Sequence, residues 1–224
     1  MGPDKKGLSR SYIFQAVVES LRRLQMDYID LYQSHEDDTQ TPLEETLDAF
    51  DRLIQDGKVR AIGASNFSAK RLAEALQVSE QYGYPRYQSL QPLFNLYDRA
   101  DYEKDLEPLC REKGLAVISY FSLASGFLTG KYRSEADLAD RARADIVKKY
   151  LNERGYRILE TLDRIAQQHN VTPAQAALAW LIAQPTITAP IASATNLEQL
   201  NQLIQATTLE LDPSSMALLN QASD

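Results

Sequence analysis

The 224-residue sequence has a single cysteine, no long apolar run and no excess of basic residues, and each of these absences excludes a class of protein. Cys110 has no second cysteine to pair with, so an intrachain disulfide is impossible and a reducing compartment is expected. No stretch is apolar for long enough to cross a bilayer, and no charged-then-apolar signal opens the sequence. A formal net charge of −7 argues against nucleic acid or an anionic membrane as the main partner. We therefore expect a cytoplasmic globular protein.

Two kinds of ligand motif are also missing. No Gly-x-Gly-x-x-Gly turn follows any apolar run, which argues against an open dinucleotide-binding sheet. Histidine, cysteine and carboxylate residues do not recur at metal-ligand spacing, so no metal site is expected. His169, near the end of a predicted helix, is expected to bond the last helix carbonyls. Cys110, within another predicted helix, is expected to pack in the core.

The sequence does contain a regular alternation of short apolar runs and amphipathic segments. The apolar runs predict strands at residues 28–32, 59–64, 87–91, 115–120 and 187–191. The amphipathic segments predict helices at 13–24, 43–57, through 72–76, and at 101–113, 154–168, 172–183, 196–203 and from 212 onward. A long loop is expected over 121–150.

Two helix starts carry the pattern of a capping box with proline just inside it. Thr41 and Glu44 form the first pattern, and Thr172 and Gln175 form the second. In such a box each side chain bonds the backbone N–H of the other residue, so both pairs predict where a helix begins.

Strands that alternate with helices predict an α/β protein with a parallel sheet, either closed as a barrel or open and doubly wound. Polar residues such as His35, Ser65 and Gln91 stand at the ends of predicted strands. Barrel enzymes keep their sites at the carboxyl ends of their strands, so this placement favours the barrel, although open sheets bind ligands there as well.

Five segments at strand ends resemble motifs of the aldo-keto reductase family, in the family's order and across nearly the whole chain. They are DYIDLYQSH at 27–35, GASNF at 63–67, QPLFN at 91–95, YFSLASGFLTGKY at 120–132 and SATNLEQL at 193–200. The resemblance implies a (β/α)₈ TIM barrel and NADPH-dependent reduction of aldehydes or ketones to alcohols. The substrate it implies is a small carbonyl compound.

The resemblance also gives the motif residues their expected roles. His35 corresponds to the catalytic histidine that helps to orient the carbonyl. The implied NADP-binding residues are Ser65, Asn66 and Gln91 at the nicotinamide carboxamide, Tyr120 against the nicotinamide ring, Phe121, Ser122, Leu123, Ser125, Gly126 and Lys131 around the pyrophosphate, and Arg141, Ser193, Thr195, Gln199 and Gln202 toward the adenosine 2′-phosphate.

Each of these residues also has a purely structural explanation. His35 can be a surface histidine paired with Glu36 or Asp37, and Lys131 can be a solvated loop charge. The sequence also departs from the family pattern near its C-terminal motif. Ser193 stands where the family usually has glycine, and Gln202-Leu203 stands where a Glu-Asn pair is frequent, so NADP and NAD both remain to be tested.

Only His35 represents the family's catalytic tetrad of aspartate, tyrosine, lysine and histidine. The resemblance places the other three on the first three barrel strands, whereas only about five of the eight strands are predicted here. We therefore expect residues 1–224 to be one barrel domain that lacks its first three strands. Such a sheet would have open edges, so we expect the chain to be part of a longer protein, or else a truncated product with a compensating partner.

Two classes of function follow. The first is a carbonyl reductase in which this chain supplies His35 and most of the cofactor site. The alternative is a nucleotide-holding redox sensor or scaffold of the same fold, as in potassium-channel β subunits, or an inactive truncated form. These residues identify neither the carbonyl substrate nor the oligomeric state. A homo-oligomer is one of the open alternatives.

Overall fold

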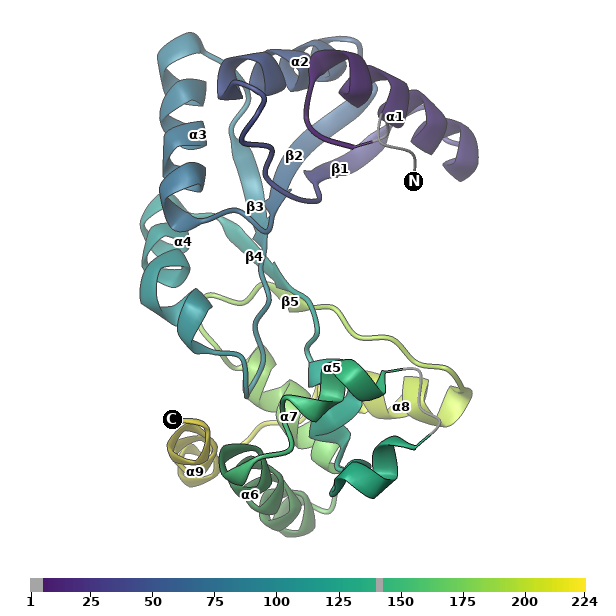
Figure 1. The fold of residues 1–224 in the computed structure, drawn as a ribbon, viewed down its shortest axis with the longest axis vertical. Helices are drawn as coiled ribbons and strands as arrows, with labels where there is room; N and C mark the ends of the chain where they lie inside the picture. Colours follow the sequence, from purple (N-terminus) through teal and green to yellow (C-terminus); the bar gives the residue numbers. More distant parts are fainter. Residues whose placement is uncertain (1–5, 140–142) are drawn as a thin grey trace. The chain divides into compact units, whose positions relative to one another are not determined.

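The computed structural model describes residues 6–139 and 143–224, which form two compact units (Figure 1). Unit 1 contains the described residues up to Pro92 together with Asp105–Val117. Unit 2 contains Leu93–Lys104 and the described residues of Ile118–Asp224. No helix among the described residues is long and apolar enough to cross a membrane.

Five parallel strands occur in the described residues, and they are hydrogen-bonded in the order in which they follow along the chain. They are β1 (Ile29–Ser34), β2 (Val59–Ser65), β3 (Tyr87–Gln91), β4 (Ala116–Ser119) and β5 (Ala189–Pro190). A doubly wound sheet reverses its strand order at a switch point, whereas barrel strands pair consecutively. The α/β class and the five strands predicted from the sequence are therefore confirmed, and the pairing order is that of part of a (β/α)₈ barrel. The closed eight-stranded barrel stays a prediction.

The helices of unit 1 are α1 (Arg10–Leu24), α2 (Leu43–Gln55), α3 (Ala69–Tyr82) and α4 (Glu107–Lys113). Helices α1, α2 and α3 lie around strands β1 to β3 in Figure 1. Leu47, Phe50 and Leu53 of α2 are buried because they recur on one face of the helix. Phe50 makes edge-to-face contacts with Tyr32 and Tyr87, at ring-centroid distances of 6.1 and 6.4 Å.

Cys110 of α4 is buried, as predicted. Burial, together with the nearby charge of Glu107, raises the pKa of the Cys110 thiol to about 11. The thiol is therefore protonated at neutral pH and behaves as a small core side chain.

The first predicted capping box is wrong. Helix α2 begins at Leu43 with Pro42 as its N-cap, and no side chain caps it. The Thr41 hydroxyl instead donates to Asp38 Oδ2 at 2.7 Å, because the extended conformation of Pro42 sets Thr41 back from the helix. The second box, between Thr172 and Gln175, is confirmed.

Unit 2 is mostly helical, and the predicted long loop after β4 is largely folded. Its helices are α5 (Ala144–Lys148), α6 (Glu153–His169), α7 (Pro173–Ile182), α8 (Leu197–Ala206) and α9 (Pro213–Ser223), together with the 3₁₀ turns Ala124–Thr129 and Glu135–Leu138. A π-helical turn at Tyr102–Leu106 has residues in both units. The region 121–150 therefore contains two 3₁₀ turns and α5 among its described residues, where only a long loop was expected.

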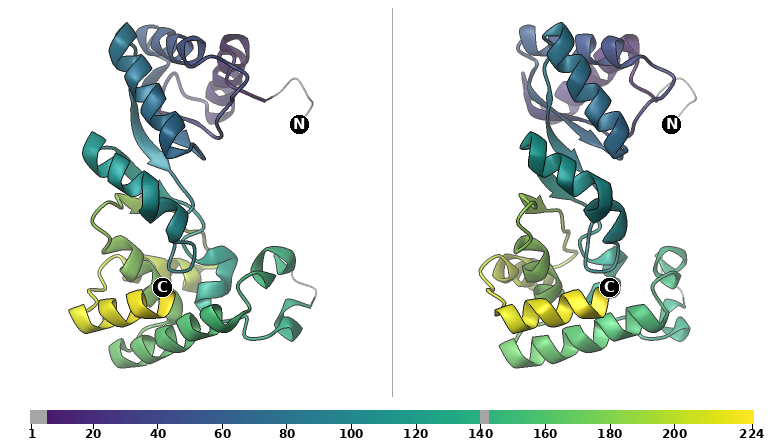
Figure 2. Two further views of the ribbon diagram at one scale, coloured as in Figure 1. Left: turned by 60° about the vertical axis from the view of Figure 1, so that its left-hand side comes forward. Right: turned by 90° about the vertical axis from the view of Figure 1, so that its left-hand side faces the viewer.

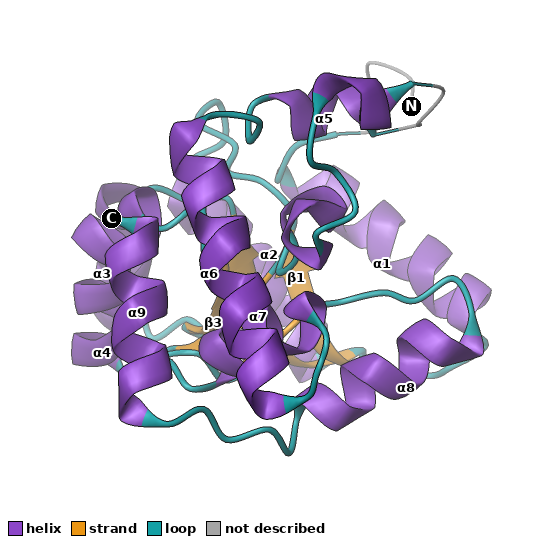
Figure 3. Cartoon of the chain, turned by 90° about the horizontal axis from the view of Figure 1, so that it is seen from below, coloured by secondary structure: helices purple, strands orange, loops and turns teal. Residues whose placement is uncertain are grey.

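Helix α6 lies alongside both α7 and α9 (Figures 2 and 3). Arginine side chains bond the last carbonyls of α9: Arg154 donates to Ser223 O, and Arg157 donates to Ala222 O at 3.1 Å. The last carbonyls of a helix have no partner within the helix, so these bonds satisfy groups that would otherwise need water.

His169 does not bond the carbonyls of its own helix, and that prediction is corrected. Its Nε2 lies 3.1 Å from Asp212 Oδ2 and 3.2 Å from Ser215 Oγ, at the start of α9. A single ring nitrogen faces both groups, and Ser215 is fully buried, so the cluster joins α6 to α9 and is not a catalytic relay.

Gly155, in the first turn of α6, is required by close packing. A Cβ atom there would overlap the Tyr150 carbonyl oxygen and lie 2.9 Å from Phe127 Cζ. At Gly130, where φ is +79°, a Cβ would meet only the end of the flexible Arg133 side chain, at 2.6 Å.

We predict that Gly155→Ala lowers the free energy of unfolding by about 3 kcal/mol, because a backbone oxygen cannot move away. Gly130→Ala should cost only about 1 kcal/mol, from its left-handed backbone. Urea denaturation followed by the fluorescence of the single tryptophan, Trp180, measures both. Equal losses in the two variants would contradict this packing account.

Candidate functional site

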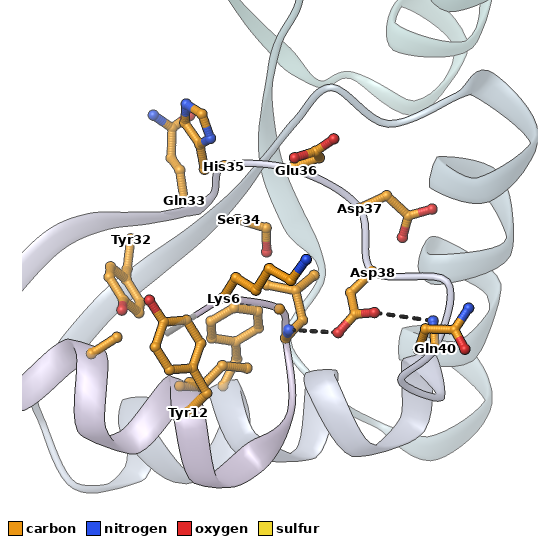
Figure 4. A pocket seen from close by; sticks show the side chains of 15 residues that line it. Lys6, Tyr12, Tyr32, Gln33, Ser34, His35, Glu36, Asp37, Asp38 and Gln40 are labelled. Atoms are coloured by element: carbon orange, nitrogen blue, oxygen red, sulfur yellow. Dashed lines mark hydrogen bonds between the residues drawn. The ribbon is translucent and has the colours of Figure 1, made fainter. Parts of the chain in front are cut away.

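The end of β1 sends alternate side chains to opposite sides of the strand. Figure 4 shows Gln33 and His35 on one side and Tyr32 on the other. Ser34 is buried, and its hydroxyl lies 3.2 Å from that of Tyr87. Burial raises the pKa of Tyr87 to about 12, so its hydroxyl stays protonated and holds this end of the strand in place. His35 is exposed just beyond the strand.

Two of the three acidic residues that follow His35 have partners elsewhere. Asp37 pairs with Arg71 at 3.1 Å. Asp38 accepts hydrogen bonds from the backbone of Leu8 at 2.8 Å and from other groups near α2. Burial opposes its ionisation, but these hydrogen bonds outweigh it and lower the pKa of Asp38. In the part of the chain that the structure describes, no ion pair joins His35 to Glu36 or Asp37, so the surface-pair explanation of His35 loses its support.

The ends of β1, β2 and β3 are joined by a row of hydrogen bonds. Asn66 Nδ2 donates to the His35 carbonyl at 3.0 Å and to Ser65 Oγ at 3.3 Å, and Ser65 Oγ donates to the Gln91 carbonyl at 2.9 Å. The strand register makes this possible, since Ser65 lies opposite Gln91. Asn66 has a φ of 55°, a left-handed conformation that asparagine tolerates better than most residues. Four predicted site residues are thus brought together in unit 1.

The side of β1 that carries Gln33 and His35 also has polar atoms without partners. Gln33 Oε1 and Ser89 Oγ are buried and make no hydrogen bond within the described residues. Both lie over Gly63, where a Cβ would overlap Ser89 Oγ and lie 3.0 Å from Gln33 Oε1. Unpaired buried polar atoms destabilise a fold, so their presence beside His35 is a feature of a ligand site.

A cavity of about 740 Å³ lies next to β1, and its lining includes Gln33 and His35. Tyr12 and Ile13 of α1, together with Tyr32 and Phe50, form much of its wall (Figure 4). The His35 side chain lies across the strand from Tyr12 and Tyr32 in Figure 4, so we do not assign the chemistry to this cavity.

In unit 2, the loop that follows β4 has a strained backbone. Phe121, Ala124 and Ser125 have φ values of 53°, 48° and 57°, although none is glycine. Gly126 follows with a φ of 96°. A left-handed backbone costs roughly 1 kcal/mol or more at each non-glycine position, and such strain is concentrated at functional sites.

Two groups in this loop suit an anion. Ser125 Oγ is buried without a hydrogen-bond partner among the described residues. The Lys131 chain lies against Gly126, with Nζ 3.2 Å from the position that a Cβ would take, and 5.0 Å from the Tyr132 ring centroid. A hydroxyl and an ammonium beside a glycine turn can contact a phosphate closely. Phe121 is exposed and Leu123 is half-buried in the same loop.

The start of the loop is tied to the segment after β5. Ser122 Oγ donates to the Ile191 carbonyl at 2.8 Å, and Ile191 N donates to the Ser119 carbonyl at the same distance. Tyr120 bridges to Leu93. Burial, and then the charge of Asp98, raise the pKa of Tyr120, so its ring is neutral.

The C-terminal motif forms the start of α8. Thr195 N and Oγ1 donate to Gln199 Oε1 at 2.9 and 3.0 Å, and Asn196 caps the helix by accepting from Gln199 N. Ser193 is exposed and Gln202 is half-buried. Arg141, expected at the 2′-phosphate, lies outside the described residues.

Asn95 and Asp98 are site residues that sequence reasoning missed. Asn95 is fully buried in the loop after β3, and its side chain bonds the Phe121 carbonyl in the loop after β4. Asn95 is the last residue of the QPLFN segment and Asp98 follows three residues later, but this pattern does not reveal burial. The described residues hold no group of three His, Cys, Asp or Glu side chains placed for a metal ion.

Comparison with known proteins identifies a family. The model of the Aldo/keto reductase family matches residues 1–224. The chain is 35% identical over 221 residues to the uncharacterized oxidoreductase YrpG of Bacillus subtilis, covering 98% of this chain and 66% of that protein.

Two further relatives have other names. An L-glyceraldehyde 3-phosphate reductase of Escherichia coli is 31% identical over 211 residues, covering 92% of this chain and 61% of that protein. A probable voltage-gated potassium channel subunit beta of Arabidopsis thaliana is 33% identical over 210 residues, covering 92% and 64%. The chain thus spans less than two thirds of the length of these relatives. With its consecutive parallel strands and its polar groups at the strand ends, the chain belongs to the aldo/keto reductase family.

Proposed function

We propose that the protein reduces aldehydes or ketones with NADPH, and that this chain supplies His35 and most of the cofactor contacts. The observation that carries the proposal is the hydrogen-bonded row that holds His35, Ser65, Asn66 and Gln91 at adjoining strand ends. The substrate is a small carbonyl compound of the cytoplasm, and the bound cofactor supplies the hydride.

The row at the strand ends suits the nicotinamide end of the cofactor. A carboxamide needs both a donor and an acceptor, which the Asn66 and Gln91 side chains can provide. Asn66, which also bonds Ser65, donates to the backbone carbonyl of His35 and so fixes the start of the segment that carries the imidazole. His35 then orients the carbonyl oxygen by a hydrogen bond while the proton comes from the family's tyrosine.

The strained loop after β4 suits the pyrophosphate. Ser125 Oγ provides an unused hydroxyl, and Lys131 provides a positive charge beside Gly126. The predicted stacking of Tyr120 on the nicotinamide is compatible with its neutral ring. Ser193, Thr195, Gln199 and Gln202 are proposed at the adenosine end, with Arg141 at the 2′-phosphate.

A nucleotide-sensing or scaffold role is the second candidate, because potassium channel subunit beta proteins are among the relatives. Both candidates require cofactor binding and differ in turnover. Multiple-turnover oxidation of NADPH by a panel of aldehydes favours the reductase. Tight binding with at most one turnover favours the sensor.

We predict that His35→Gln lowers kcat for carbonyl reduction about 100-fold while the Kd for NADPH changes little, because the imidazole acts on the substrate. The assay uses the protein at its natural length, since the resemblance places the rest of the tetrad outside this chain. His169→Gln is the matched control, as this histidine only joins α6 to α9. The catalytic assignment is wrong if the two variants retain the same kcat.

We predict that Lys131→Ala weakens NADPH and NADH binding by similar factors of about 10 or more, because the pyrophosphate is common to both and a charged hydrogen bond is lost. Lys70→Ala, which removes an exposed lysine of α3 that pairs only loosely with Glu74, is the control. Fluorescence titration gives all the Kd values. If Lys131→Ala binds both nucleotides as the unchanged protein does, the loop is not the pyrophosphate site.

A further inference from the structure

The side chain of Asn95 in unit 2 is a fully buried amide, and both its oxygen and its nitrogen make two hydrogen bonds. Its Oδ1 accepts from the backbone N–H groups of Tyr97 and Asp98 at 2.8 and 2.9 Å. Its Nδ2 donates to the Asp98 carboxylate and to the Phe121 carbonyl, both at 3.0 Å. The first three bonds shape the turn after Phe94, and the fourth reaches a different loop, 26 residues further along the chain.

Asp98 extends these contacts to a third segment of unit 2. Its Oδ2 accepts from the Tyr150 hydroxyl at 2.7 Å, and its Oδ1 lies 3.2 Å from Lys149 Nζ. Burial, and then the bond to Asp98, raise the pKa of Tyr150 well above its ordinary value. Tyr150 therefore stays protonated as a donor, and Asp98 Oδ2 accepts from both Asn95 and Tyr150.

The same contacts reach both ends of the strained loop. Asn95 bonds the carbonyl of Phe121, where φ is 53°. The Tyr150 ring stacks on Phe127 with centroids 5.3 Å apart, at the other end of the loop. Ser125 and Gly126, with their left-handed backbones, lie between these two attachments. Fixing both ends opposes relaxation of the strained residues between them.

We propose that Asn95, Asp98 and Tyr150 form a positioning network that holds the loop 121–127 in its pyrophosphate-binding conformation before the cofactor arrives. The inference rests on the proposed function, because it assigns a cause to the shape of that cofactor site. A loop already in its bound conformation loses less entropy on binding, so the network should tighten binding without touching the cofactor. Asn95 is thus a positioning residue.

Asn95→Asp gives the sharpest test. The substitution keeps the acceptor toward Tyr97 N but puts an oxygen in place of the amide that faces the Phe121 carbonyl and the Asp98 carboxylate. At pH 8 that oxygen repels both, and we expect the Kd for NADP⁺ to rise about 30-fold, the loss typical of a buried hydrogen bond turned into an unpaired contact. Two carboxylates side by side raise each other's pKa, so at pH 5.5 the pair should hold a proton.

That proton restores a donor, and the deficit should shrink to less than about 5-fold at pH 5.5. Isothermal titration calorimetry at both pH values measures the Kd of the variant, and dividing by the Kd of the unchanged protein removes the titration of the 2′-phosphate itself. Recovery at low pH is a result that a loss of packing alone would not produce.

A matched pair of tyrosine variants keeps the test informative if Asn95→Asp does not fold. Tyr150→Phe removes the hydroxyl that bonds Asp98, and Tyr102→Phe removes a buried hydroxyl of unit 2 that bonds Thr186 instead. We expect Tyr150→Phe to weaken NADP⁺ binding about 5-fold at both pH values and Tyr102→Phe to leave it unchanged.

Three results would overturn the inference. Unchanged NADP⁺ binding by Asn95→Asp at pH 8 would do so, as would equal deficits at both pH values. Equal weakening of NADP⁺ binding by the two tyrosine variants would show that loss of a buried hydroxyl has the same effect whether or not that hydroxyl bonds Asp98. If the unchanged protein fails to bind NADP⁺, the proposed function fails too, whereas the other outcomes leave that function standing.

Discussion

The parallel pairing of consecutive strands is the constraint on which the candidate site depends. Because each strand pairs with the next one along the chain, the polar residues that follow β1, β2 and β3 emerge at the same end of the sheet. The register then sets Ser65 opposite Gln91, and short side chains complete the row of hydrogen bonds. If β2 slipped by a single position, Ser65 would turn to the opposite face of the sheet and lose its bond to Gln91.

A second constraint acts in unit 2, where tertiary contacts hold the backbone in an intrinsically unfavourable conformation. The loop after β4 contains three non-glycine residues with positive φ. Asn95 and Tyr150 supply the contacts that hold this backbone, and Ser125 Oγ is left buried without a partner within the described residues. Strain together with an unused hydroxyl is expected where a fold gives up stability for binding.

Much of the fold could be predicted from periodicity, since helical and strand-like spacing of apolar residues reports directly which faces are buried. The sequence predicted the partners of individual side-chain hydrogen bonds less reliably. The box at Thr172 formed, whereas Thr41 found a nearer partner in Asp38, a competition between two hydrogen bonds that sequence spacing cannot resolve. His169 likewise bonds side chains 43 and 46 residues away instead of the carbonyls of its own helix.

The candidate site likewise contains residues that the sequence could identify and residues that it could not. Residues at strand ends, such as His35 and Ser65, could be chosen because parallel strands place their ends together. Asn95 could not, because its importance comes from burial and from a bond to another loop. The roles of the chosen residues in holding NADP stay predictions, and Arg141 lies outside the described residues.

A crystal structure of the protein grown with NADP⁺ tests the central claim most directly. The account predicts the pyrophosphate within hydrogen-bond distance of Ser125 Oγ and Lys131 Nζ, and the carboxamide against Asn66 and Gln91. It also predicts that the left-handed backbone at Ser125 is retained. A cofactor bound elsewhere, or a loop that is rebuilt around the pyrophosphate, would contradict the account.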